Sequence, residues 1–187
     1  LLGYLSSHSQ SSSLITDNER RAMTLLSLGE NPYAFNGTNY IAPIVSSFDG
    51  TQFGDASLVN DDIFALLLLS ASGYSATDEM IAKDIQFIVS KQRPDGSWEG
   101  SIDLTAAAVQ ALQAFSAAPE AVAKATAYLQ NAQQADGGFG SVYSTSWAMQ
   151  AGASWSKNGK TPTDYLASLQ ATDGAALSSS ESINNRV

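Results

Sequence analysis

The sequence predicts an all-α fold built from helix-pair repeats. Asp-Gly pairs begin at positions 49, 95, 136 and 173, so the steps between them are 46, 41 and 37 residues. An amphipathic segment precedes each of the later pairs, and more apolar segments alternate with these amphipathic ones. A period near 40 residues with helical flanks is typical of helix-pair repeats. No segment shows the polar–apolar alternation of a β-strand. Together these observations favour eight to nine helices and no sheet.

The amphipathic segments are predicted to form the first helix of each repeat. In the best-patterned one, Ile81, Ile85 and Ile88 recur at helical spacing. The corresponding helices of the next two repeats begin near Pro119 and Pro162, since a first helical turn tolerates proline. The Asp-Gly pair then ends each helix, because glycine readily adopts the left-handed backbone of a helix C-terminus.

More apolar segments supply the second helix of each repeat, and we expect these over Ile63–Ser72, Asp103–Phe115 and Ser144 to about Ser154. The first of them is apolar on all sides, so it should be buried on all sides. An amphipathic outer layer and an apolar inner layer follow from this alternation.

The remaining elements lie before the first clear repeat. Thr16-Asp17-Asn18-Glu19 has the form of a capping box that opens a helix through Leu26. Residues 30–57 are the least regular part of the chain, and one short helix is expected near Tyr40 to Val45.

A seven-residue motif surrounds the Asp-Gly pairs. It is intact over residues 92–98, has Phe for Trp over 133–139, is eroded over 170–176, and is weakest over 46–52, where Gln52 falls at the aromatic position. Its recurring residues are Gln92, Gly96, Trp98, Gln133, Gly137, Phe139 and Gln170.

This motif resembles the QW motif of squalene–hopene cyclases and other class II terpenoid cyclases. The wider pattern, over roughly residues 57–176, resembles the prenyltransferase and squalene-oxidase repeat superfamily. The resemblance implies an α/α toroid with two concentric helical layers, and it is closest to noncatalytic modules of large bacterial exported or surface proteins. It also implies a structural role for the motif, in which Gln caps amides at the start of a neighbouring helix and Trp stacks over it.

The catalytic motif of the class II cyclases, Asp-x-Asp-Asp-Thr-Ala, corresponds here to residues 101–106. Asp103 and the Thr-Ala pair remain, whereas Ser101 and Leu104 replace the flanking acids. Protonating an alkene requires a strong, buried acid tuned by its neighbours. Asp103 is therefore only a weak candidate for a general acid, and its simpler interpretation is a helix N-cap.

Composition excludes several classes of site and partner. There is no Cys and a single His, His8, so zinc sites of the protein prenyltransferase type and thioesters are excluded. We expect no cofactor and no metal, and we interpret Asp61 and Asp62 as helix caps. A net charge of −9 argues against nucleic acid, and the longest apolar run, Ile63–Leu69, is too short for membrane insertion.

Two hypotheses for function remain. The first is a noncatalytic toroid module, extracellular or on the cell surface, that binds a protein partner or an apolar small molecule. The second is a cyclase-like enzyme with Asp103 as acid, and a corrinoid-binding module is a further alternative. We expect one repeat domain over residues 1–187, cut from a longer chain, since a closed ring of this period needs roughly 250 residues. Weak candidates for ligand-binding residues are Asp61, Phe64, Tyr143 and Trp147.

Overall fold

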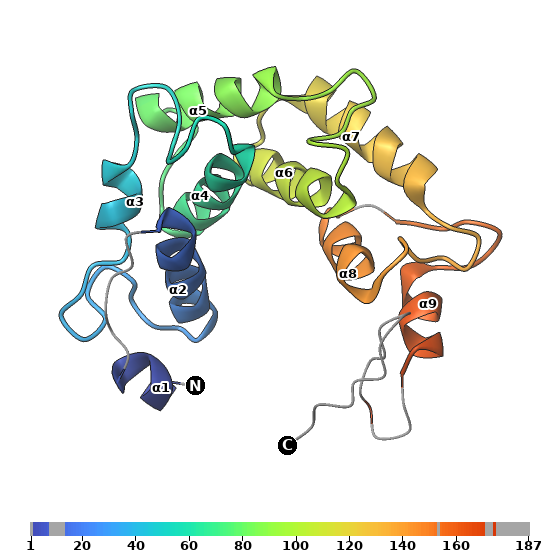
Figure 1. The fold of residues 1–187 in the computed structure, drawn as a ribbon, viewed down its shortest axis with the longest axis horizontal. Helices are drawn as coiled ribbons and strands as arrows, with labels where there is room; N and C mark the ends of the chain where they lie inside the picture. The colour runs from blue at the N-terminus through green and yellow to red at the C-terminus, as the bar shows by residue number, and fades with distance from the viewer. Residues whose placement is uncertain (1, 8–13, 153, 171–173, 175–187) are drawn as a thin grey trace. The chain divides into compact units, whose positions relative to one another are not determined.

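The computed structural model describes residues 2–7, 14–152, 154–170 and 174. Over these residues the chain is all-α, as predicted, and β-structure is limited to isolated bridges in turns (Figure 1). His8 and the Asp173 copy of the Asp-Gly pair lie outside the described residues, apart from Gly174. The helices are α1 (Leu2–Ser7), α2 (Ile15–Ser27), α3 (Ala42–Ser46), α4 (Val59–Ala71), α5 (Glu79–Ser90), α6 (Ile102–Ala114), α7 (Pro119–Ala132), α8 (Val142–Gln150) and α9 (Pro162–Ser168).

The chain divides into two compact units. Unit 1 comprises residues 1–91 and 114–117, and contains α1 to α5. Unit 2 comprises residues 92–113 and 118–187, and contains nearly all of α6 together with α7, α8 and α9.

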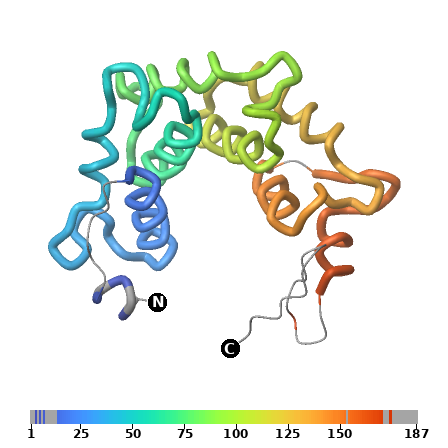
Figure 2. The backbone as a smooth tube through the Cα atoms, viewed as in Figure 1, coloured from blue at the N-terminus to red at the C-terminus, as the bar shows by residue number. Residues whose placement is uncertain are grey.

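Unit 1 is organised around α4. As the all-apolar pattern predicted, this helix is buried over most of its surface, and α2 and α5 both pack against it (Figure 1). Helix α3 packs on α2 and confirms the short helix expected near residues 40–45. The segments 28–41 and 47–58 around α3 are irregular loops and turns (Figure 2). The fully buried apolar residues of α4 are Ile63, Ala65, Leu66, Leu68 and Leu69.

Unit 2 is organised around α6, which is rich in alanine. Small side chains allow close approach of neighbouring backbones, and most of α6 is buried. Helix α7 buries a stripe of Ala121, Ala125 and Leu129, and α8 packs against α9. The Phe139 ring meets the Trp155 ring edge to face, with centroids 5.6 Å apart. The Trp155 indole N–H donates to the Ala148 carbonyl (2.8 Å), so this aromatic pair is anchored to α8.

The glutamines of the repeat motif make the same hydrogen bond in each repeat. The side-chain amide donates to the glycine carbonyl four residues later, in the pairs Gln92–Gly96 (2.9 Å), Gln133–Gly137 (2.9 Å) and Gln170–Gly174 (3.0 Å). The expectation that the Gln side chain accepts hydrogen bonds from helix amides is wrong. Its Nε2 instead donates to backbone carbonyls, which the tight turn leaves in need of a donor. Gln92 also donates to the Ala121 carbonyl (2.8 Å) in the first turn of α7, which fastens one repeat to the next.

The aromatic residue of each repeat is held by a side chain of the following buried helix. Its backbone N–H donates to that side chain in the pairs Phe53–Asp62 (2.8 Å), Trp98–Thr105 (3.1 Å) and Phe139–Thr145 (2.9 Å). Trp98 and Phe139 are therefore equivalent. In unit 1 the aromatic position is Phe53, one residue later than the sequence alignment with Gln52 implied. Asp62 takes the place that a threonine occupies in the other two repeats.

The motif glycines are required by close packing on the next outer helix. Gly96 (φ +90°) and Gly137 (φ +91°) both have left-handed backbones. A Cβ on Gly96 would overlap the Lys124 carbonyl in α7, and one on Gly137 would overlap the Thr161 carbonyl just before α9. Glycine at this position thus serves both the turn and the approach of the following repeat.

Several predicted helix ends differ from the structure. Helix α2 begins at Ile15, so its N-cap residue is Leu14, whose apolar side chain cannot cap; Thr16 lies inside the first turn and Glu19 is buried. Helix α6 begins at Ile102, and the Ser101 hydroxyl accepts from the Leu104 N–H (3.2 Å), so Ser101 and not Asp103 is the cap. Helix α8 spans Val142–Gln150, earlier than predicted, and Ser141 caps it.

Candidate functional site

The residues that the sequence nominated for ligand binding fall in both units. Asp61 is buried and Phe64 is half-buried on α4 in unit 1. Tyr143 is 72% exposed and Trp147 is half-buried on α8 in unit 2. Asp103 is half-buried in the first turn of α6. Each unit therefore contains only part of the nominated set.

Unit 1 contains a group of buried carboxyl groups that the sequence analysis did not assemble. Glu19 on α2, Asp61 and Asp62 on α4, and Asp84 on α5 are all less than 5% exposed. Aspartate and glutamate are almost never buried to this degree without a cationic partner. We refer to these four residues as the carboxyl cluster.

Helix α4 directs Asp61 and Asp62 back onto the loop that precedes it. Asp62 Oδ1 accepts from the Phe53 N–H (2.8 Å), and Asp61 Oδ2 accepts from the Asp55 N–H (3.2 Å). A Cβ on Gly54 would overlap the Asp61 carboxylate, so the loop lies directly on this side chain. The interpretation of these aspartates as caps of α4 is therefore wrong: they hold residues 53–55 against the helix.

Asp84 lies in the middle of the buried face of α5. Ile81, Asp84 and Ile88 are the buried residues of that helix, whereas Ile85, predicted to lie on the stripe, is only half-buried. Glu19 occupies a similar place on α2, where it is 1% exposed. The amphipathic pattern of each helix thus points a carboxyl group into the core of unit 1.

Burial changes the acidity of Glu19, Asp62 and Asp84. Burial, together with the charges of Asp61 and Asp62, raises the pKa of Glu19 from 4.5 to about 9. Burial raises the pKa of Asp84 strongly, with added contributions from a hydrogen bond to Asp62 and from the Asp62 charge. Burial also raises the pKa of Asp62, against the opposing effect of its hydrogen bond with Asp84. A hydrogen bond between the carboxyl groups of Asp62 and Asp84 requires that one of them is protonated.

This arrangement supports proton storage better than acid catalysis. An acid with a raised pKa is weak, whereas protonation of an alkene needs a strong one. The side chains of Glu19, Asp62 and Asp84 are also almost fully shielded from solvent. Over the part of the chain that the structure describes, no three acidic or histidine side chains are grouped so that they could hold a metal ion.

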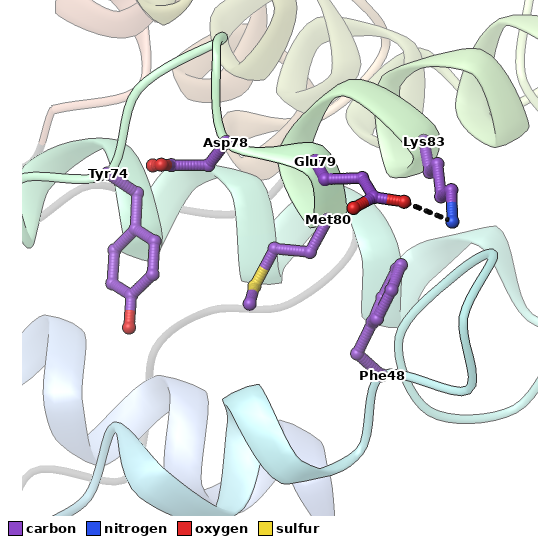
Figure 3. A pocket seen from close by; sticks show the side chains of 6 residues that line it. All are labelled: Phe48, Tyr74, Asp78, Glu79, Met80 and Lys83. Atoms are coloured by element: carbon purple, nitrogen blue, oxygen red, sulfur yellow. Dashed lines mark ion pairs between the residues drawn. The ribbon is translucent and has the colours of Figure 1, made fainter.

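A second feature of unit 1 is an open cleft of about 400 Å³ (Figure 3). Phe48, Tyr74 and Met80 give it apolar and aromatic walls. Its charged residues lie at the start of α5 and just before it, and Lys83 Nζ forms an ion pair with Glu79 Oε1 (2.8 Å). We refer to this feature as the α5 cleft, and its lining is Phe48, Tyr74, Asp78, Glu79, Met80 and Lys83.

The sequence held signals for the carboxyl cluster. Asp84 is three residues after Ile81 and four before Ile88, so a helix that buries both isoleucines also buries position 84. Glu19 is three residues before Ala22, which is fully buried. No local sequence pattern predicts that Phe48 and Met80 line the same cleft. The α5 cleft combines a loop after α3 with a helix that begins about 30 residues later.

Comparison with known families gives a match to the squalene–hopene cyclase C-terminal domain over residues 33–185. The chain belongs to this family. The match includes the repeat motifs, the carboxyl cluster apart from Glu19, and all residues of the α5 cleft. It supports the predicted prenyltransferase and squalene-oxidase repeat superfamily and its α/α toroid fold. A comparison with curated proteins found no significant match.

The length and composition of the helices test the expectation that the chain does not insert into a membrane. Among the described residues, none of the helices is both long enough and apolar enough to cross a bilayer.

Proposed function

We propose that this chain is a noncatalytic toroid module of a bacterial exported or cell-surface protein, and that it binds a partner at the α5 cleft. The observation that carries the proposal is the lining of the cleft, which joins the apolar side chains of Phe48, Tyr74 and Met80 to an acidic rim. Binding sites commonly combine an apolar floor with a few charged groups that orient the ligand.

Charge indicates the chemistry of the partner. The rim carries the carboxylates of Asp78 and Glu79 and one cation, Lys83, so its formal charge is negative, as is that of the whole chain at −9. Electrostatic complementarity favours a cationic group beside an apolar one. A partner segment that presents an aromatic or aliphatic side chain next to Lys or Arg has this chemistry.

An NMR titration with two aromatic probes of similar size and opposite charge tests the proposal. Phenethylammonium combines an aromatic ring with a cation, and phenylacetate replaces the cation by an anion. We expect the cation to shift the amide signals of Tyr74, Met80 and Lys83, and the anion to leave them unchanged. Met80→Lys should abolish the response, whereas Met149→Lys, at a partly exposed methionine of unit 2, should preserve it. Equal responses to both probes, or none in the wild type, would contradict the proposal.

Membership of the cyclase family favours one alternative, an enzyme that uses Asp103 as general acid. The neighbouring positions Ser101 and Leu104 carry no carboxyl group, so Asp103 lacks the partner acids of the cyclase motif. Incubation with squalene and shorter polyprenyl substrates, followed by analysis for cyclic products, tests this alternative. Turnover that Asp103→Asn abolishes would establish it and overturn the noncatalytic proposal.

A further inference from the structure

The carboxyl cluster brings acidic groups from three helices of unit 1 into one buried place. Glu19 comes from α2, Asp61 and Asp62 from α4, and Asp84 from α5. Both carboxyl oxygens of Glu19 and of Asp84, and Oδ2 of Asp62, have no hydrogen-bond partner if every carboxyl group is ionised. A buried carboxylate without a donor is strongly destabilising, so protons are the simplest partners that these oxygens can have.

The charged groups that face the cluster do not neutralise it. The charges of Asp61 and Asp62 on α4 raise the pKa of Glu19, and the charge of Arg20 on its own helix lowers it. The charges of Asp62 and Glu19 raise the pKa of Asp84. The Arg20 side chain is 76% exposed and lies 3.7 Å from Asp17, so water and Asp17 screen its effect. Helix α3, which packs on α2, has no titratable side chain.

We propose that protons control the docking of α5 on the rest of unit 1, with the helix held in place when Glu19, Asp62 and Asp84 retain protons and released as these three groups ionise. Asp84 is the only acidic residue among the three buried positions of α5. Ionisation of Asp84 beside Asp62 and Glu19 places like charges between the packed faces of α5, α4 and α2. The packing of α5 therefore weakens as these groups lose their protons.

The direction of the pH effect follows from linkage. The pKa of Glu19 is 4.5 when the side chain is solvated and about 9 when unit 1 is folded. Between these values the folded state keeps a proton that the opened state releases. The stabilisation is complete below pH 4.5 and declines as the pH rises toward 9. The raised pKa of Asp84 adds to the effect in the same direction.

The chain itself supplies a matched substitution. Asp62 holds the place of Thr105, since both accept from the backbone N–H of the repeat's aromatic residue. Asp84 lies eight residues before Gln92, and Ala125 lies eight residues before Gln133, so Asp84 corresponds to Ala125. The double variant Asp62→Thr/Asp84→Ala thus gives unit 1 the residues that unit 2 already uses.

Hydrogen exchange of the α5 amides in the full chain, from pH 5 to pH 9 and corrected for intrinsic exchange, tests the proposal. Protection should fall about tenfold per pH unit for each proton that is released. The slope should disappear in Asp62→Thr/Asp84→Ala and should decrease in Glu19→Gln. It should be unchanged in Glu120→Gln, an exposed glutamate of α7. If the double variant does not fold, Glu19→Gln decides the result.

A wild-type protection that is constant from pH 5 to pH 9 would overturn the proposal, and so would an unchanged slope in Glu19→Gln. Helix α5 also carries Glu79, Met80 and Lys83 of the α5 cleft, so binding of phenethylammonium should weaken as the pH rises. This last consequence rests on the proposed function. Exchange of α5 is measured without any probe, so a cleft that binds nothing would refute the proposed function and leave the proton-dependent docking intact.

Discussion

Replacement of Trp98 by alanine tests the core of unit 2 and the structural interpretation of its repeat motif. The indole is fully buried, and an aromatic side chain of this size buries on the order of 150–250 Å². At about 25 cal/mol per Å², the lost burial corresponds to roughly 4–6 kcal/mol. Measured losses for large aromatic-to-alanine substitutions are about 3–5 kcal/mol, so we expect Trp98→Ala to destabilise unit 2 by ~4 kcal/mol.

Urea unfolding followed by far-UV circular dichroism measures this loss without relying on tryptophan fluorescence. Two variants set the scale. Trp98→Phe introduces the residue that the chain already has at the equivalent Phe139, and it should lose only ~1–2 kcal/mol. Tyr143→Ala removes an aromatic side chain that is 72% exposed, and it should change the free energy of unfolding by less than ~0.5 kcal/mol.

A loss below ~1 kcal/mol for Trp98→Ala would refute the reasoning. It would mean that the indole is peripheral in solution and that the motif does not hold the repeat together. An equal loss in Tyr143→Ala would equally show that burial does not determine the effect.

Three further predictions concern the same unit and the metal content of the chain. Gly96→Ala should destabilise by ~1–3 kcal/mol more than Gly159→Ala, because both positions have positive φ but only the Gly96 methyl would overlap a carbonyl; equal losses would contradict the packing argument. Thr105→Val should lose ~1–3 kcal/mol in urea unfolding, since it leaves a buried N–H without an acceptor, whereas Thr126→Val, whose hydroxyl bonds within its own helix, should change stability little. Elemental analysis of protein without a histidine tag should find no transition metal in stoichiometric amount, because thiolate ligands are absent and imidazole nearly so; a stoichiometric metal would contradict this prediction.

The fold was predictable because its signals are local and repeated. Helix α4 is apolar on all sides from Ile63 to Leu69, and the spacing of the Asp-Gly pairs marks where each outer helix ends. The motif glycines could be assigned to turns from sequence, but their second role could not. Contact of Gly96 with the Lys124 carbonyl depends on how the next repeat packs, and no local pattern encodes that.

The candidate site was less predictable, since its residues meet only in three dimensions. An aspartate near a helix start has the same local signature whether it caps the helix or points into the core. Asp62 and Asp103 were both interpreted as caps, yet Asp62 holds the Phe53 N–H, and Ser101 caps the helix of Asp103. Glu19 looked like part of a capping box for the same reason, although it is buried with Asp62.

Direct titration of the carboxyl cluster by NMR tests the central claim that unit 1 stores protons in its core. The side-chain carboxyl ¹³C signals of Glu19 and Asp84 can be followed from pH 3 to pH 10 in the full chain, with the exposed Glu120 as an internal reference. We expect Glu19 to titrate near pH 9 and Asp84 well above the usual range of an aspartate. If Glu19 and Asp84 instead titrated near pH 4, unit 1 would hold ionised carboxylates at neutral pH, and the account of a proton-held core would be wrong.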